Sequence, residues 1–120
     1  MLYEQVGGED FFRKLVSRFY LGVAQDPLLR PLYPEEDLEP AAQRLQLFLM
    51  QYFGGPGTYS EQRGHPRLRM RHVGFAIGEP EQSAWLHHMR QSLDEAQLPP
   101  ELDQPIWTYF QQAAQFLRNR

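Results

Sequence analysis

The sequence predicts an all-α domain. Apolar residues recur at three- and four-residue spacing through several long stretches, and Gly and Pro residues separate these stretches. No run alternates apolar and polar residues as a half-buried strand does, and no segment repeats another. Because 120 residues, 42% of them hydrophobic, suffice for one core and little more, we expect a single domain over residues 1–120.

The first long helix is expected from Glu9 to Gln25. Glu9 favours its first turn through the helix dipole, and the pair Asp26-Pro27 ends it. Prolines at 27, 31 and 34 then leave room for only a short helical turn from Leu28 to Tyr33. The apolar face of the long helix consists of Phe12, Val16, Phe19, Tyr20 and Val23.

A second long helix is expected from about Asp37 to Tyr52, with Pro40 tolerated in its first turn. The run Gly54-Gly55-Pro56-Gly57 ends it, and we expect a long loop from there to Pro66. Loops of this length in compact domains tend to be functional or to wrap a ligand. The inward face of the helix consists of Leu38, Ala41, Ala42, Leu45, Phe48, Leu49 and Tyr52.

Three further helices complete the prediction. A short one is expected from Arg67 to about Ala76, and longer ones from about Glu81 to Ala96 and from about Glu101 to Leu117. Pro105 lies near the first turn of the last helix and leaves room for a later start. Their inward residues are Leu68, His72, Phe75 and Ala76, then Trp85, Met89, Leu93 and Ala96, then Leu102, Ile106, Tyr109, Phe110, Ala113, Phe116 and Leu117.

The stretch from Gly54 to His72 is the most informative for function. Arg63, Arg67, Arg69 and Arg71 make up a third of the 12 cationic residues, although the net charge of the chain is -3. The stretch therefore predicts a local anion site in an acidic protein. A histidine among arginines and beside an apolar face is what haem requires, because iron needs a nitrogen ligand and the propionates need cations.

Four histidines could supply that ligand, and the residues alone do not choose among them. His72 has Leu68 and Phe75 as helical neighbours that could pack on a porphyrin. His88 follows Trp85 by three residues and could face the same pocket, whereas His65 lies in the loop. The fourth is His87.

Several motifs resemble those of truncated haemoglobins of the second group. They are Ser17-Arg18-Phe19-Tyr20, the segment from Leu32 to Leu38, Gln51-Tyr52-Phe53-Gly54-Gly55-Pro56 continuing through Tyr59 to His72, and Ala84-Trp85-Leu86. The resemblance extends over essentially the whole chain. It implies a shortened globin, built as a two-over-two helical sandwich that encloses haem b.

The resemblance also implies roles for individual residues. His72 would be the proximal iron ligand, while Tyr20, Tyr33 and Trp85 would donate hydrogen bonds on the distal side. Ala41 would stand where many globins have a distal histidine, and Tyr33 where many relatives have phenylalanine. The cofactor contacts expected are Ala41, Leu45, Phe48, Tyr59, Arg63, His65, Leu68, Arg71, His72 and Phe75, with Tyr59, Arg63, His65 and Arg71 as candidates for the propionates.

A distal side of this kind predicts slow ligand release. Each hydrogen bond is worth about 1 kcal/mol, and roughly 3 kcal/mol slows release by around two orders of magnitude. The expected ligands are oxygen, carbon monoxide, nitric oxide or peroxide, with an unidentified reductant. Peroxidase-like or nitric oxide dioxygenase-like chemistry is then the hypothesis, in preference to bulk oxygen transport.

Composition excludes several other classes. Without cysteine the chain has no disulfide, iron–sulfur cluster or covalent haem attachment, and the acidic balance argues against general nucleic-acid binding. Neither a signal peptide nor a membrane span is visible, so we expect a cytoplasmic monomer or homodimer with no membrane partner. One alternative remains: a helical binding module whose arginine-rich loop contacts nucleic acid or an acidic partner. A hydrolase is the weaker third interpretation, because no hydrolase motif is present.

Overall fold

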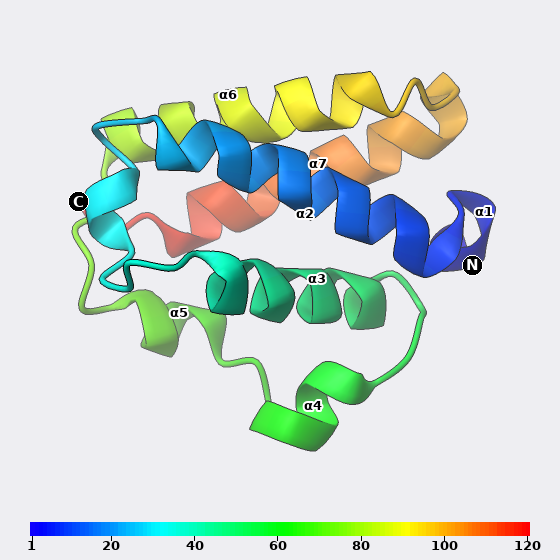
Figure 1. Cartoon of the computed structure of the whole chain (residues 1–120), viewed down its shortest axis with the longest axis horizontal. Coiled ribbons are helices and arrows are strands. Elements are labelled where there is room, and N and C mark those ends of the chain that lie inside the picture. Colours follow the sequence, from blue (N-terminus) through cyan, green and yellow to red (C-terminus); the bar gives the residue numbers. More distant parts are fainter.

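The computed structural model describes residues 1–120, and all of its regular structure is helical (Figure 1). The elements in chain order are α1 (Leu2–Gln5), α2 (Gly8–Ala24), the 3-10 helix η1 (Arg30–Leu32), α3 (Glu39–Tyr52), α4 (Thr58–Arg63), α5 (Leu68–His72), α6 (Glu79–Glu95) and α7 (Pro100–Leu117). No helix is both long enough and apolar enough to cross a membrane.

The long helices form two antiparallel pairs. Helix α2 packs against α3 and against α6, and α6 packs against α7. In Figure 1, α2 and α3 run in opposite directions, as do α6 and α7. This arrangement confirms the predicted two-over-two helical sandwich.

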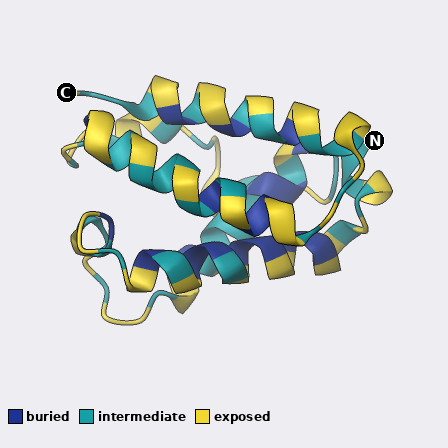
Figure 2. Ribbon diagram, turned by 90° about the horizontal axis from the view of Figure 1, so that it is seen from above, coloured by how far each residue is buried: buried dark blue, intermediate teal, exposed yellow.

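Helix α2 supplies the centre of the hydrophobic core. Its residues Phe12, Leu15 and Phe19 are completely buried, as are Met89 of α6 and Ile106 of α7. Full burial of a side chain of this size contributes about 1.5–3 kcal/mol. Figure 2 shows the buried faces of the long helices turned toward one another.

The segment after α3 differs from the prediction. The expected loop from Gly54 to Pro66 contains α4, and Gly64, which directly follows this helix, has a φ of +75°, a positive value that favours glycine. The helix predicted over 67–76 is only the five-residue α5, since glycine at position 74 disfavours its continuation.

Helix ends and three positions expected to face inward also differ from the prediction. The short α1 was not predicted, and α6 begins at Glu79 because Pro80 is tolerated in a first turn. Helix α7 begins at Pro100 and continues through Pro105, so the later start is wrong. Tyr52, Ala76 and Phe116 were expected to face inward, but all three are exposed, Tyr52 by 54% and Phe116 by 53%.

A largely buried polar contact ties α6 to the segment that directly follows α2. Nε2 of His88 lies 2.7 Å from Oδ2 of Asp26, and both side chains are largely buried. The hydrogen bonds with His88 and with the Leu28 amide lower the pKa of the Asp26 carboxyl. His88 is therefore engaged between helices, and the interpretation of it as an alternative haem ligand is not supported.

Gly22 makes the close approach of His88 possible. A Cβ atom at this position would lie 2.4 Å from Nδ1 of His88, whose ring is held by Asp26. We therefore expect Gly22→Ala to lower the free energy of unfolding, although alanine is the better helix former by about 1 kcal/mol.

Urea unfolding of the haem-loaded protein measures this effect. In a His88→Ala background the clash is gone, so the same substitution should be neutral or stabilising by up to about 1 kcal/mol. Equal destabilisation in both backgrounds would show that His88 is not the obstacle.

Candidate functional site

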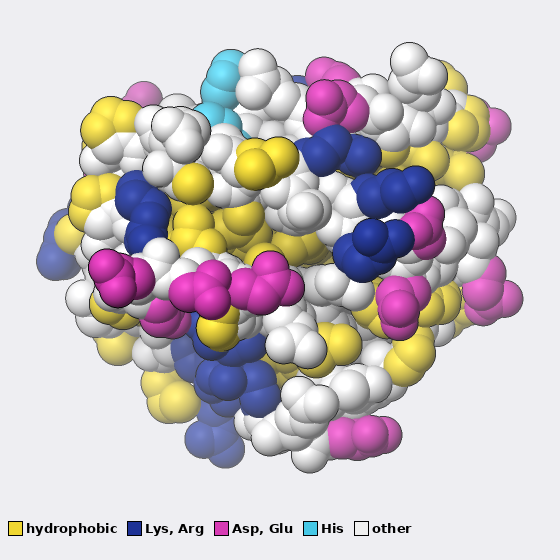
Figure 3. Space-filling model, viewed as in Figure 1, with side chains coloured by type: hydrophobic (Ala, Val, Ile, Leu, Met, Phe, Trp, Pro, Cys, Tyr) yellow, Lys and Arg dark blue, Asp and Glu magenta, His cyan; other side chains and the backbone are white.

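A cavity of about 600 Å³ opens between the two helix pairs. It is lined by 26 residues, 18 of them hydrophobic, from η1, the long helices and the short helices α4 and α5. Figure 3 shows hydrophobic side chains on the floor of a hollow, with acidic and basic side chains along its edges. A large apolar pocket with few convergent polar groups is the usual form of a cofactor site.

His72 is the only histidine that lines this cavity. Its Nδ1 lies 2.6 Å from the carbonyl oxygen of Leu68, one helical turn earlier. Because a carbonyl can only accept, Nδ1 carries a proton, and in the neutral imidazole the lone pair is then on Nε2. Leu68 and Phe75 line the cavity next to the imidazole, so the ring is presented within an apolar surface.

Tyr20, Tyr33 and Trp85 also line the cavity. The rings of Tyr20 and Tyr33 meet edge to face with centroids 5.5 Å apart, and Trp85 packs between Phe19 and Phe110. Burial raises the pKa of both phenols, with Tyr33 adding to the effect on Tyr20. Both hydroxyl groups therefore stay protonated, and the phenols of Tyr20 and Tyr33 hydrogen-bond each other.

The cavity fits haem better than a metal ion held by protein ligands alone. No group of three or more His, Asp or Glu side chains in the chain could hold a metal. A porphyrin supplies four nitrogens of its own, so iron would need only one imidazole from the protein. Residues Arg44, Arg63 and Arg71 line the same cavity and provide the cations that propionates require.

Comparison with known proteins identifies the family. The family model for bacterial-like globins matches residues 1–119. The chain belongs to the bacterial-like globin family. Globins of this family bind haem b, so the cofactor predicted from the sequence is confirmed, and the binding-module alternative has no support.

Individual relatives cover nearly the whole of this globin. The group 2 truncated haemoglobin YjbI of Bacillus subtilis is 38% identical over 118 residues, 98% of this chain and 88% of the relative. The structure of a thermostable haemoglobin from Thermobifida fusca has a TM-score of 0.97 and 59% identity, covering 99% and 97% of the two chains. A truncated oxygen-avid haemoglobin from Bacillus subtilis has a TM-score of 0.92 and 38% identity, covering 98% of each chain.

The globin's arginine-rich segment is organised by Arg71. Its Nε donates to the carbonyl of Pro66 at 2.8 Å and its Nη2 to that of Arg63 at 3.1 Å. The guanidinium of Arg63 lies 6.0 Å from the ring centroid of Tyr59, which is buried. Tyr59, Arg63 and Arg71, which were predicted to contact the cofactor, line the cavity. His65 was predicted to do so as well, but it is exposed and does not line the cavity.

Asn119, near the C-terminus, holds the segment that follows His72. Its Nδ2 donates to the carbonyl of Phe75 at 2.8 Å, and its Oδ1 accepts from the amide of Ile77 at 2.9 Å. The Asn119 amide donates to the Ile77 carbonyl at 2.8 Å. Sequence reasoning missed this residue, because an asparagine beyond the last helix carries no signal of a contact more than 40 positions away.

The third helix forms the wall predicted for it and adds an ion pair. Ala41, Leu45 and Phe48 line the cavity as expected. Arg44, which was not predicted, donates to Oε1 of Glu35 at 3.1 Å, and Glu35 Oε2 is the one buried side-chain polar atom without a partner. A hydrogen bond from its own amide, then that from Arg44, lower the pKa of Glu35, so the rim carries an ionised carboxylate.

The last helix contributes wall residues that the sequence did not assign to the site. Tyr109, Phe110, Ala113 and Leu117 line the cavity, although their spacing predicted only an inward face. Periodicity identifies a buried face but does not separate a packed core from a cavity wall.

Asn119→Ala should loosen the segment that carries His72. Loss of the two side-chain hydrogen bonds to Phe75 and Ile77, worth about 1 kcal/mol each, predicts haem loss faster by about thirtyfold. Transfer of haem to an excess of apomyoglobin measures the rate, and Arg120→Ala is the control, because the backbone bond from Arg120 to Ile77 remains. An unchanged rate in Asn119→Ala would contradict the assigned role.

Proposed function

We propose that this globin holds haem b through Nε2 of His72 and binds a diatomic ligand on the opposite side, beneath Tyr20, Tyr33 and Trp85. The observation that carries the proposal is the hydrogen bond from His72 Nδ1 to the Leu68 carbonyl. It leaves Nε2 as the acceptor in an apolar cavity, and it makes the imidazole more basic as a metal ligand. When bound, haem supplies the iron at which a diatomic ligand is taken up.

The cavity walls support a defined orientation of the porphyrin. Leu68 and Phe75 would pack on its proximal face, and Leu45 and Phe48 belong to the wall formed by α3. The guanidinium groups of Arg44, Arg63 and Arg71 are the candidates for the propionates. Two donors of Arg71 already bind loop carbonyls, so Arg71 would both order the loop and contact the cofactor.

The distal side favours retention of the ligand. Two phenols that stay protonated and one indole N–H would donate to a ligand that carries partial negative charge. Ala41, which is small and almost fully buried, leaves space for a ligand to reach this side. The similar truncated haemoglobin from Bacillus subtilis, which is described as oxygen-avid, supports ligand retention in this globin as well.

Slow release suits chemistry or sensing more than transport. A carrier must unload, whereas a protein that retains its ligand gives a reductant or a second reactant time to arrive. We infer that peroxidase-like or nitric oxide dioxygenase-like turnover is the class to test, with the reductant to be identified.

Titration with haemin tests the proximal assignment. The protein should develop a sharp Soret band that saturates at one haem per chain, and His72→Ala should lose or shift this band because iron loses its protein ligand. His88→Ala should keep it, since that side chain binds Asp26 outside the cavity.

Far-UV circular dichroism shows whether both variants fold, and free imidazole should restore the band of His72→Ala by replacing the missing ligand. A normal band in His72→Ala without imidazole would overturn the assignment.

Stopped-flow measurement of oxygen release tests the distal assignment. Tyr20→Phe should accelerate release by about fivefold, because one hydrogen bond is worth about 1 kcal/mol. Replacement of Tyr20, Tyr33 and Trp85 together by Phe should approach a hundredfold for about 3 kcal/mol. Tyr3→Phe, which lies outside the cavity, is the control, and equal rates in all variants would refute the role of the three donors.

A further inference from the structure

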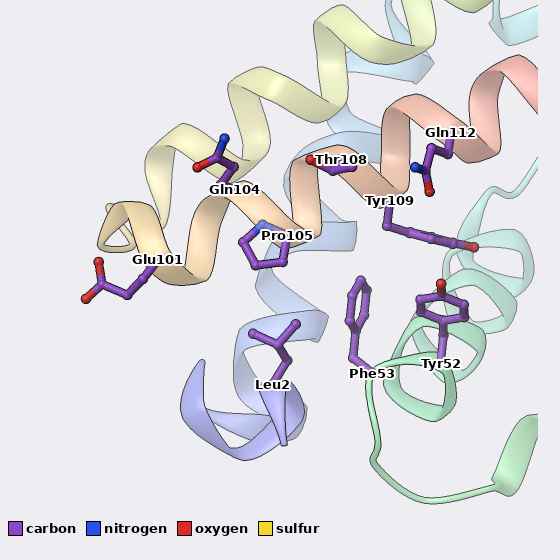
Figure 4. Close-up of a pocket in the computed structure, with 9 residues that line it drawn as sticks. All are labelled: Leu2, Tyr52, Phe53, Glu101, Gln104, Pro105, Thr108, Tyr109 and Gln112. Carbon is purple, nitrogen blue, oxygen red and sulfur yellow. The ribbon is translucent and has the colours of Figure 1, made fainter.

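Tyr109 connects the haem cavity with a second, open groove on the surface. The groove, of about 670 Å³, is lined by nine residues, and Tyr109 belongs to its wall and to that of the haem cavity. Figure 4 shows the rings of Tyr109, Tyr52 and Phe53 together at one end of the groove, with Pro105 and Leu2 toward the other. The ring centroids of Tyr109 and Tyr52 are only 4.0 Å apart, with the planes tilted by 31°.

This contact leads from the cavity to solvent. Tyr52 is 54% exposed, a large value for an aromatic ring at a position expected to face inward. Tyr20 and Tyr33 contact each other and are not exposed, Tyr59 packs on Phe48, and Trp85 packs on two buried phenylalanines. Of the tyrosines and tryptophans that line the haem cavity, Tyr109 is therefore the one whose ring contacts an exposed oxidisable ring.

We propose that Tyr109 and Tyr52 pass single electrons from small phenols in this groove to the haem cavity when hydrogen peroxide is the oxidant there. The inference rests on the proposed haem binding. The groove suits a phenol, because the faces of Tyr52, Phe53 and Pro105 can contact a flat ring, and the side chains of Gln104, Thr108 and Gln112 can hydrogen-bond its hydroxyl group.

The electrons and protons balance. Each of two phenol molecules gives up one electron and one proton and leaves as a phenoxyl radical. The two electrons break the O–O bond of one peroxide molecule, and the two protons complete two molecules of water. Tyr109 and Tyr52 are oxidised and reduced in turn, so neither is consumed.

The surroundings of the two tyrosines favour Tyr52 as the residue that carries the radical. Burial, with a further contribution from Tyr52, raises the pKa of the Tyr109 phenol, so its proton is held firmly. The exposed Tyr52 can release its proton directly to water. An oxidised ring at Tyr52 is also within reach of an external donor.

Radical trapping tests the path without relying on turnover. The haem-loaded protein is treated with an equimolar amount of hydrogen peroxide and a nitroso spin trap, and the adduct is mapped by mass spectrometry. We expect the adduct on Tyr52, lost in Tyr52→Phe, reduced about tenfold in Tyr109→Phe and unchanged in Tyr3→Phe. An undiminished adduct on Tyr52 in Tyr109→Phe, or adducts confined to other residues, would overturn the proposal.

Oxidation of p-cresol by peroxide separates a redox role from a structural one. Tyr52→Phe preserves an aromatic ring but removes the oxidisable group, so kcat/KM should fall about tenfold, whereas Tyr52→Trp should restore most of it. Equal loss in the Phe and Trp variants would indicate packing alone and refute the path. A Soret band that does not depend on His72 would refute the proposed haem site, whereas a normal band with no adduct on Tyr52 refutes only the electron path.

Discussion

The functional site depends on how a very short helix is held in place. Helix α5 has five residues and no buried side chain, so neither its own hydrogen bonds nor hydrophobic burial can fix it. Hydrogen bonds with residues beyond the helix hold it in place. Arg71 binds carbonyls of the preceding loop, and Asn119 binds the backbone that follows His72. The imidazole hydrogen-bonds the Leu68 carbonyl through Nδ1, so a set of polar contacts positions the proposed iron ligand.

The rest of the chain provides the rigid frame for these contacts. The fully buried side chains of α2, α6 and α7 pack into one core, and the His88–Asp26 pair ties α6 to the segment that follows α2. The side chains that line the cavity of about 600 Å³ beside this core have no packing partners on the side that faces the cavity. A bound cofactor supplies the missing contacts, so haem binding and folding stabilise each other.

The polar groups of the cavity wall differ in their exposure to solvent. The protonated phenols of Tyr20 and Tyr33 hydrogen-bond each other and are shielded from solvent. The Glu35–Arg44 pair, which is close enough to both phenols to influence their pKa values, is more exposed. Tyr109 belongs to neither group, because it forms the wall between the cavity and the outer groove.

The sequence by itself determined the helical class and the extent of the long helices, and every cofactor contact that it predicted except His65 lines the cavity. Apolar spacing is a local property, so α2, α3 and α6 were predicted to within about two residues, and the pattern ending at His72 pointed to haem. Tertiary structure decided what depends on contacts between distant residues: the role of Asn119, the engagement of His88 with Asp26 and the exposure of Tyr52. It also decided that the apolar face of α7 lines a cavity, since periodicity records burial but not what fills the space beside it.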